Sequence, residues 1–175
     1  MSENLVFVVD EQDNPLTPLP RPQVIKEGLW RRTGGILIVN PRTKQILCQK
    51  RSDTKDERLG VWISMFGGKS DPGETPKQTV IRELEEESSI RLNARQLNFF
   101  VKVKSEKHHQ FEYLFWAKWE GDIATLAYDK EEVSEIGWYD IDSVLLNLTE
   151  NAKGWYCYGE GELATIRYVQ SKIKT

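Results

Sequence analysis

The chain has 175 residues, and its 39% hydrophobic and 29% charged residues suit one globular domain over residues 1–175 and exclude a disordered chain. Its 24 basic and 27 acidic residues give a net charge of -3, so no general attraction to nucleic acid or anionic lipid is expected. The sequence contains no apolar stretch near the roughly 18 residues of a membrane span and no recognisable signal peptide, which favours a cytoplasmic protein.

Residues 1–28 predict an N-terminal strand followed by an extended connector. Leu5 to Val9 has the composition of a strand, and the polar segment 10–15 that follows is rich in turn-forming residues. Four prolines then occur within eight positions, and they predict extended backbone and no helix: Pro15, Pro18, Pro20 and Pro22.

The remainder of the chain alternates between strand and helix patterns. Strand-like runs at 35–39 and 45–49 flank a turn at 40–44, which predicts a hairpin. We then expect, in chain order, an apolar run at 61–66, a helix from Thr75, strands at 99–103, 111–119 and 136–139, a helix from 141 to 148 and a terminal helix at 162–174. This order predicts an α/β (α+β) domain with a mixed, mostly covered sheet and a helical part at 141–175.

Local chemistry fixes where the first long helix begins. Thr75 is a good N-cap, Pro76 suits the first helical position, and Gln78 can complete a capping box with Thr75. A helix is therefore predicted from this point on.

The same helix carries an unusual group of carboxylates. At about 100° per residue, Glu83, Glu86 and Glu87 fall on one face, whereas Glu85 points elsewhere. Like charges at this spacing repel, and a divalent cation removes that penalty, since Mg²⁺ prefers oxygen ligands and often bridges carboxylates to phosphates. A solvated acidic helix face is the alternative interpretation of such a run.

The surrounding spacing favours the cation site. Gly68 is followed after five residues by Glu74, after seven more by Arg82-Glu83-Leu84-Glu85-Glu86-Glu87, and after two more by Ile90. This pattern, over residues 68–90, resembles the signature of the Nudix hydrolase family, the Nudix box. One position departs from it: Ser89 stands where the family usually has glycine, and serine in a left-handed helix end would cost about 1 kcal/mol.

The resemblance implies both a fold and a site. It implies a mixed sheet between helices, with Glu83, Glu86, Glu87 and the carbonyl of Gly68 binding Mg²⁺ or Mn²⁺. It also implies a structural ion pair between Arg82 and Glu74.

A second resemblance lies outside the box. Arg51, Lys55 and the run Gly60-Val61-Trp62 are similar to a segment of the isopentenyl-diphosphate isomerases and the hydrolases that resemble them. That resemblance implies that Arg51 and Lys55 bind the pyrophosphate, for which both cations are suited. It also implies that Glu132, six residues before Trp138, is an extra metal ligand or a general base, with Glu131 and Glu135 as competitors.

Isomerase chemistry is disfavoured by what the sequence lacks. The isomerases have a catalytic cysteine after the tryptophan that corresponds to Trp62, and residues 63–66 (Ile-Ser-Met-Phe) contain none. Cys48 and Cys157 are expected to be buried free thiols, and with His108 and His109 they do not form a zinc-binding pattern. His108 and His109 are expected to lie in a surface loop.

The sequence therefore predicts a Mg²⁺- or Mn²⁺-dependent pyrophosphohydrolase, with Glu83 or Glu132 activating the attacking water. The expected partner is a small pyrophosphate substrate derived from a nucleotide, and a homodimer is compatible with the sequence. Nucleoside triphosphates, nucleotide sugars, ADP-ribose, dinucleoside polyphosphates and capped RNA all remain open as substrates. A ligand-sensing module without catalysis is the alternative.

Overall fold

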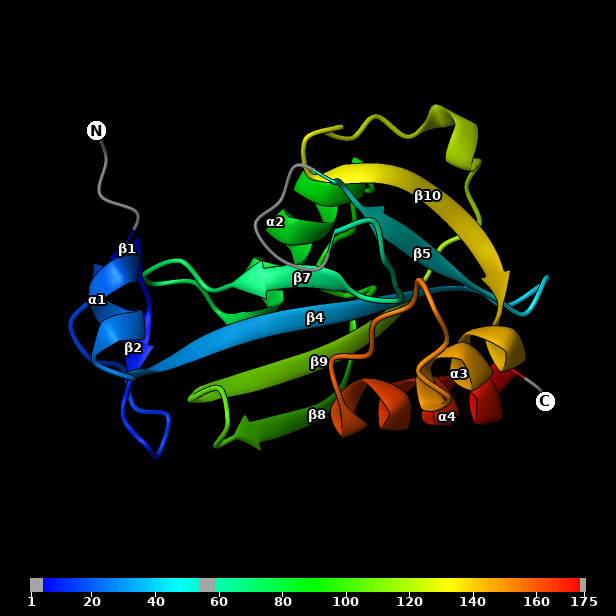
Figure 1. The fold of residues 1–175 in the computed structure, drawn as a ribbon. Coiled ribbons are helices and arrows are strands. Elements are labelled where there is room, and N and C mark those ends of the chain that lie inside the picture. Colours follow the sequence, from blue (N-terminus) through cyan, green and yellow to red (C-terminus); the bar gives the residue numbers. More distant parts are fainter. Residues whose placement is uncertain (1–4, 54–58, 174–175) are drawn as a thin grey trace.

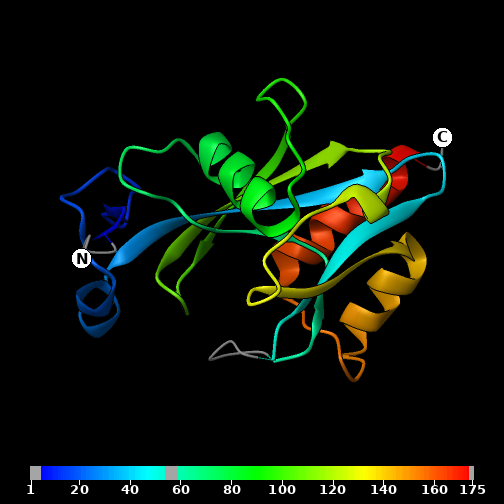
Figure 2. The same ribbon diagram turned by 90° about the horizontal axis from the view of Figure 1, so that it is seen from above.

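A mixed β-sheet with helices on both faces organises the chain, as Figures 1 and 2 show for the computed structural model, which describes residues 5–53 and 59–173. The strands are β1 (Leu5–Val6), β2 (Val8–Val9), β3 (Leu19–Pro20), β4 (Trp30–Asn40), β5 (Gln45–Arg51), β6 (Trp62–Ile63), β7 (Phe66–Lys69), β8 (Asn98–Ser105), β9 (Gln110–Lys118) and β10 (Val133–Asp140). The helices are α1 (Arg21–Lys26), α2 (Pro76–Ser88), the 3₁₀ turn η1 (Ile123–Thr125), α3 (Ile141–Thr149) and α4 (Glu160–Ile173).

The long strand β4 is the centre of the sheet, whose main strand order is β10-β5-β4-β9-β8. Along one edge β4 pairs in parallel with β9, from Arg31 opposite Gln110 to Val39 opposite Lys118. Along its other edge it pairs antiparallel with β2, then β7, then β5. Strands β1 and β3 form a separate two-stranded sheet.

Alternating side chains of β4 build two cores. Ile36 and Ile38 belong to a fully buried cluster that includes α2 residues such as Leu84. Leu37 and Val39 belong to the second cluster, on the opposite face, with α3 and α4. This two-residue period places α2 on one face of the sheet and the pair α3 and α4 on the other (Figures 1 and 2).

The predicted fold class, a mixed sheet covered by helices, is confirmed by this arrangement. The hairpin predicted at 35–39 and 45–49 is the β4–β5 connection, closed where Val39 pairs with Ile46. The helices predicted from Thr75 and at 141–148 and 162–174 correspond to α2, α3 and α4. Within the described part of the chain, no helix is long and apolar enough to cross a membrane.

The prediction of a purely extended connector before residue 28 was wrong. Helix α1 spans Arg21–Lys26 and begins directly after Pro20, with Pro22 in its first turn. A proline in the first turn removes no intrahelical hydrogen bond, because the amide groups there have no helical partner. The predicted strand at 5–9 is also divided, since β1 pairs with β3 and β2 pairs with β4.

The N-terminal turn is joined to the sheet by a buried aspartate. The Asp13 carboxylate contacts Arg32 Nε at 2.6 Å and Lys102 Nζ at 2.5 Å, and the Tyr113 hydroxyl donates to it. Burial alone would raise the pKa of Asp13, but hydrogen bonds from these three side chains outweigh it and hold the pKa below its ordinary value. The charged carboxylate therefore stabilises the contact between the turn, β4, β8 and β9.

We predict that Asp13→Ala lowers the free energy of unfolding by about 3 kcal/mol, because it leaves Arg32 without its buried partner. The folded-state pKa of Asp13 is lowered, so this contribution is complete above the ordinary aspartate pKa near 3.9 and is lost as the pH falls below it. Urea unfolding at neutral and acid pH measures the difference. Glu11→Ala, an exposed position in the same turn, is the matched control and is expected to change stability by less than about 0.5 kcal/mol. Equal stability of the two variants at neutral pH would contradict the prediction.

Candidate functional site

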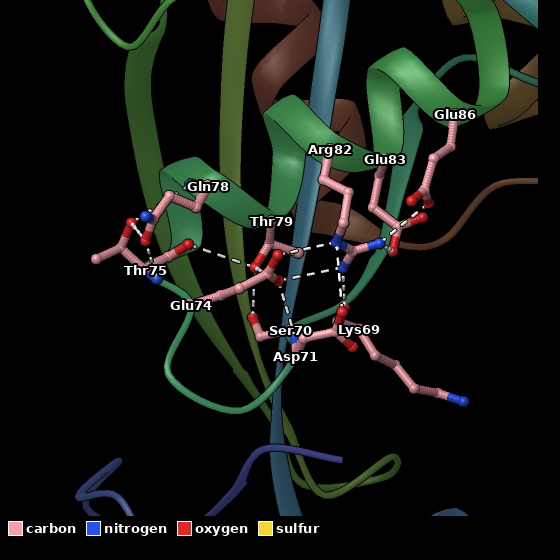
Figure 3. A network of polar contacts seen from close by, with 10 residues as sticks. All are labelled: Lys69, Ser70, Asp71, Glu74, Thr75, Gln78, Thr79, Arg82, Glu83 and Glu86. Carbon is pink, nitrogen blue, oxygen red and sulfur yellow. Dashed lines mark hydrogen bonds and ion pairs between the residues drawn. The ribbon is translucent and has the colours of Figure 1, made fainter. Parts of the chain in front are cut away.

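The N-terminus of α2 is fixed by its own first turn. The Gln78 amide donates to Thr75 Oγ1 at 3.3 Å, and the Thr75 amide donates to Gln78 Oε1 at 2.8 Å, which completes the predicted capping box (Figure 3). This turn determines the helical position, and therefore the direction, of every carboxylate that follows.

Arg82 connects the loop before α2 to the carboxylates on the helix. Its Nε and Nη2 contact the two oxygens of Glu74 at 2.8 and 3.1 Å, and Nη2 also donates to the carbonyl of Lys69 at 3.0 Å. Figure 3 shows Nη1 directed the other way, toward Glu83 at 2.8 Å and Glu86 at 3.1 Å. The hydrogen bond with Glu74, opposed by burial and aided by the charge of Glu83, raises the pKa of Arg82. A planar guanidinium can serve all these acceptors at once, which an ammonium group cannot.

Glu83 lies against the main chain of β7. Its side chain is 16% exposed, and a Cβ atom at Gly68 would stand 2.5 Å from its Oε1. Only a glycine at position 68 allows the carboxylate this close to the backbone. Burial raises the pKa of Glu83, and the positive charge of Arg82 opposes that rise.

Glu87 is held one residue earlier in β7, at Gly67. The amide of Gly67 donates to its Oε2 at 2.9 Å, and Gln49 Nε2 donates to the same oxygen at 3.0 Å. Burial, and next the negative charge of Glu83, raise the pKa of Glu87 to about 8. A buried carboxylate beside a second carboxylate is a costly arrangement that an added cation would stabilise.

Two further glutamates complete the acidic group. Glu86 is more open, with 57% of its side chain exposed, and contacts Arg82. Glu132 is exposed in the loop before β10, where its carbonyl accepts a hydrogen bond from the Ser52 amide at 3.0 Å. Its negative charge contributes to the raised pKa values of Glu83 and Glu87, which places its carboxylate within electrostatic range of both.

The donor chemistry of this group fits a hard divalent cation. The carboxylates of Glu83 and Glu87 lie beside the Gly67–Gly68 backbone, Glu86 is joined to Glu83 through Arg82, and oxygen donors of this kind suit Mg²⁺ or Mn²⁺. Among the described residues, no three Asp, Glu, His or Cys side chains already converge on one point. Arg82 holds Glu83 and Glu86, while Glu87 is turned toward β7, so binding a cation would require these side chains to exchange partners.

A cleft of about 720 Å³ adjoins the same glycines. Arg51, at the end of β5, lines it together with Gly67 and Gly68, and His108 and His109 stand at its far end. Arg51 and the Gly67–Gly68 backbone therefore share this cleft, as a site for pyrophosphate would require. Lys55, the other predicted pyrophosphate-binding residue, lies outside the described residues.

Two features at the end of α2 follow the sequence pattern. Glu85, predicted to point away from the other carboxylates, pairs with Arg91 at 2.7 Å on the exposed side. Ser89 ends the helix with φ 59°, the left-handed conformation that favours glycine. Its hydroxyl accepts a hydrogen bond from the Ala127 amide at 2.8 Å, so serine here connects α2 to the loop that carries Glu132.

Sequence reasoning missed Gln49. This buried glutamine donates to both the Met65 carbonyl, at 3.1 Å, and Glu87, and so positions the most buried carboxylate of the site. The available signal was a polar residue that follows the apolar run Ile46-Leu47-Cys48 within a strand. A buried amide in such a strand needs polar partners, which here come from α2 and from Met65, just before β7.

The family of the chain follows from this fold and from its matches to known proteins. A model of the NUDIX domain family matches residues 29–158, and the chain belongs to that family. An uncharacterised Nudix hydrolase of Rhodococcus erythropolis is 38% identical over 89 residues, which cover 51% of this chain and 48% of that protein. The chain thus spans about half the length of this curated relative.

More distant matches extend over nearly the whole chain. An isopentenyl-diphosphate Delta-isomerase of Serratia proteamaculans is 23% identical over 153 residues, covering 85% of this chain and 83% of that protein. A crystal structure from Deinococcus radiodurans superposes with a TM-score of 0.73 over 94% of this chain and 98% of that one, at 17% identity. The second match shows a shared fold alone, whereas the first agrees with the resemblance to the isomerase branch seen in the sequence.

We predict that Arg82→Lys lowers the free energy of unfolding by about 2 kcal/mol, because lysine keeps the charge but cannot contact Glu74, Glu83 and the Lys69 carbonyl together. Denaturant unfolding is the measurement. Arg91→Lys is the matched control, since its ion pair with Glu85 is exposed, and it should change stability by less than about 0.5 kcal/mol. A loss no larger at Arg82 than at Arg91 would show that the loop before α2 does not depend on the arginine fork.

Proposed function

We propose that this chain is a pyrophosphohydrolase that uses Mg²⁺ or Mn²⁺ to cleave a phosphoanhydride bond in a nucleoside diphosphate linked to another moiety. The observation that carries the proposal is the position of Glu83 and Glu87, largely buried against the Gly67–Gly68 backbone, which also lines the cleft. Isolated carboxylates would not be held there for stability, because burial and mutual repulsion raise their pKa values.

The acidic group and the cleft have separate roles in this proposal. Glu83, Glu86, Glu87 and the Gly68 carbonyl would hold the divalent cation, which when bound would polarise the phosphoryl oxygens and lower the pKa of the attacking water. Arg51 would bind the pyrophosphate from the cleft side, with Lys55 as its proposed companion. Glu74 and Arg82 would keep the loop and helix at fixed separation, as their two hydrogen bonds allow.

We assign the general base to Glu132. Of the two candidates, Glu83 is bound by Arg82 and packed against Gly68, so that its oxygens are committed to positioning and to the cation. Glu132 is exposed and lies within electrostatic range of both inner carboxylates, on a loop attached to β5 by the Ser52 hydrogen bond. A carboxylate in that position can accept a proton from water without leaving the cation unsupported.

Isomerisation of an allylic diphosphate is not supported by the site. Ser64, in the segment where the isomerases have their cysteine, is fully buried and donates to Glu162 at 2.5 Å. The hydroxyl is therefore occupied in the core between β6, β7 and α4. The hydrolase proposal requires no residue at that position.

The decisive experiment measures phosphate-containing products from a panel of nucleoside-diphosphate compounds, with Mg²⁺ and with a chelator. We expect Mg²⁺-dependent turnover of at least one compound, and Glu86→Gln should lower kcat by about a hundredfold or more, since one oxygen ligand loses its charge. Glu85→Gln, on the same helix but paired with Arg91, is the matched control and should retain activity within about twofold.

The same experiment can reject the enzyme. If no compound is turned over, and a nucleotide binds equally well to the wild type and to Glu86→Gln without Mg²⁺, the chain is a ligand-sensing module. Equal losses in Glu85→Gln and Glu86→Gln would instead show that the helix face is not the cation site.

The assignment of the base predicts that Glu132→Gln lowers kcat by about a hundredfold, within the range of general-base catalysis, while the Mg²⁺ concentration for half-maximal activity stays within about threefold. Steady-state kinetics with the best compound of the panel test this. Glu131→Gln, the neighbouring exposed residue, is the control. An unchanged kcat in Glu132→Gln would move the role of base to Glu83.

A further inference from the structure

The cleft continues well beyond the proposed pyrophosphate site. From the Gly67–Gly68 pair it follows β4 through Gly35 and Thr33 to Arg31, which lies four residues from Gly35. At about 3.3 Å per residue, Arg31 is on the order of 13 Å along the strand from the glycine pair. A group that reaches both ends is therefore longer than a pyrophosphate.

The floor of this far end consists of polar residues from two parallel strands. Arg31 and Thr33 of β4 lie opposite Gln110 and Glu112 of β9 in the strand register, and the two-residue period places all four on one face of the sheet. Arg31 Nη2 donates to Gln110 Oε1 at 3.2 Å, and Gln110 donates in turn to Glu112. These hydrogen bonds fix the arginine plane within the cleft.

One donor of this arginine is unused. Arg31 Nε is buried and has no hydrogen-bond partner among the described residues, although buried polar atoms are nearly always paired. A second arginine, Arg21 of α1, lines the same cleft. Burial, and next the charge of Arg21, lower the pKa of Arg31. A buried, unpaired donor beside another cation indicates that an anion would be stabilised here.

The rim of the cleft adds further positive charge. Lys107 lines the opening from the β8–β9 turn and Arg21 lines it from α1, and these two side chains carry the charge. Glu112 lies on the same face as Arg31, where its charge opposes the lowering of the Arg31 pKa, and Gln110 donates to it. Glu162, the other acidic residue among the described residues that line the cleft, accepts hydrogen bonds from Ser64 and from the Tyr158 amide. The balance of charge at this end is positive. The other end is formed by the Gly67–Gly68 backbone, which the carboxylates of α2 contact from the other face of the sheet.

We propose that Arg31, with Arg21, forms a subsite for a second phosphoryl group of the substrate, separated from the scissile anhydride by at least a ribose. The substrate class is then a nucleoside-diphosphate compound with an additional phosphate. The role in substrate binding rests on the proposed function, whereas the binding of an anion at Arg31 does not.

Anion binding can be measured without turnover. In the full-length ¹⁵N-labelled protein, the Nε–H signal of Arg31 is assigned by its loss in Arg31→Lys, and inorganic phosphate is then titrated in metal-free buffer. We expect a saturable shift of that signal in the wild type, together with an unshifted signal for the exposed Arg42, which pairs with Glu120. An unmoved Arg31 signal at about 50 mM phosphate, well above the millimolar range of a weak site, would overturn the proposal.

Kinetics tests whether the anion belongs to the substrate. The panel of compounds includes NADH and NADPH, a matched pair that differs by one ribose phosphate. Arg31→Gln should raise KM about tenfold or more for the compounds with an added phosphate and leave kcat within about twofold, since a charged hydrogen bond is lost from binding alone. Arg31→Lys should recover part of the loss. Arg42→Gln, the same substitution at an exposed arginine, is the control and should leave KM unchanged.

The outcomes separate this inference from the proposed function. A phosphate-induced shift at Arg31 without turnover of any compound leaves the anion site standing but removes both the hydrolase and the substrate role. Turnover with a KM that Arg31→Gln changes for no compound retains the hydrolase and overturns the subsite. Thermal unfolding of each variant confirms that the comparison is made between folded proteins.

Discussion

The close contact between two glycines of β7 and two carboxylates of α2 is the constraint on which the site depends. A Cβ atom at Gly67 would lie 2.1 Å from the Gly34 carbonyl oxygen, and one at Gly68 would lie 2.5 Å from Glu83. Strand β7 can therefore pair with β4 on one side and receive carboxylates on another only because it has no side chains there. Gly67 also has φ 152°, which side chains rarely tolerate, and its amide donates to Glu87.

This contact makes the site costly for folding. Two buried carboxylates with raised pKa values face a backbone amide and one guanidinium, so a large part of their charge is not neutralised within the chain. Arg82 offsets part of this cost and uses its other edge to hold Glu74, which keeps the loop before α2 in place. The loop and the carboxylates consequently share one arginine, and a change in either alters the hydrogen bonds available to the other.

Local patterns in the sequence predicted the parts that depend on local physics. The capping box at Thr75 and Gln78 fixed the start of α2, the apolar runs predicted the β4–β5 hairpin, and the missing glycine at Ser89 correctly drew attention to a left-handed helix end. The extended backbone predicted at Pro22 is instead the first turn of α1, because the restriction that disfavours proline in a helix interior is tolerated there.

The parts that depend on distant pairing were not predictable from one sequence. Gln49 meets Glu87 across 38 positions, and Arg31 meets Gln110 across 79, through the parallel pairing of β4 with β9. No local propensity determines which strands become neighbours in a mixed sheet, since the pairing is decided by how the whole core packs. The roles given to Arg51, Lys55 and Glu132 come from resemblance and remain predictions for the same reason.

In the proposed function, the sheet separates the catalytic group from the residues that would select the substrate. The carboxylates approach the Gly67–Gly68 backbone from α2, on one face of the sheet, whereas Arg31, Thr33 and the residues opposite them in β9 face the other side. The glycine pair is common to both, because a strand without side chains leaves its peptide groups accessible from either face. On this proposal, substitutions in the far part of the cleft would change which molecule is bound without moving the acidic group, because β7 stands between the two.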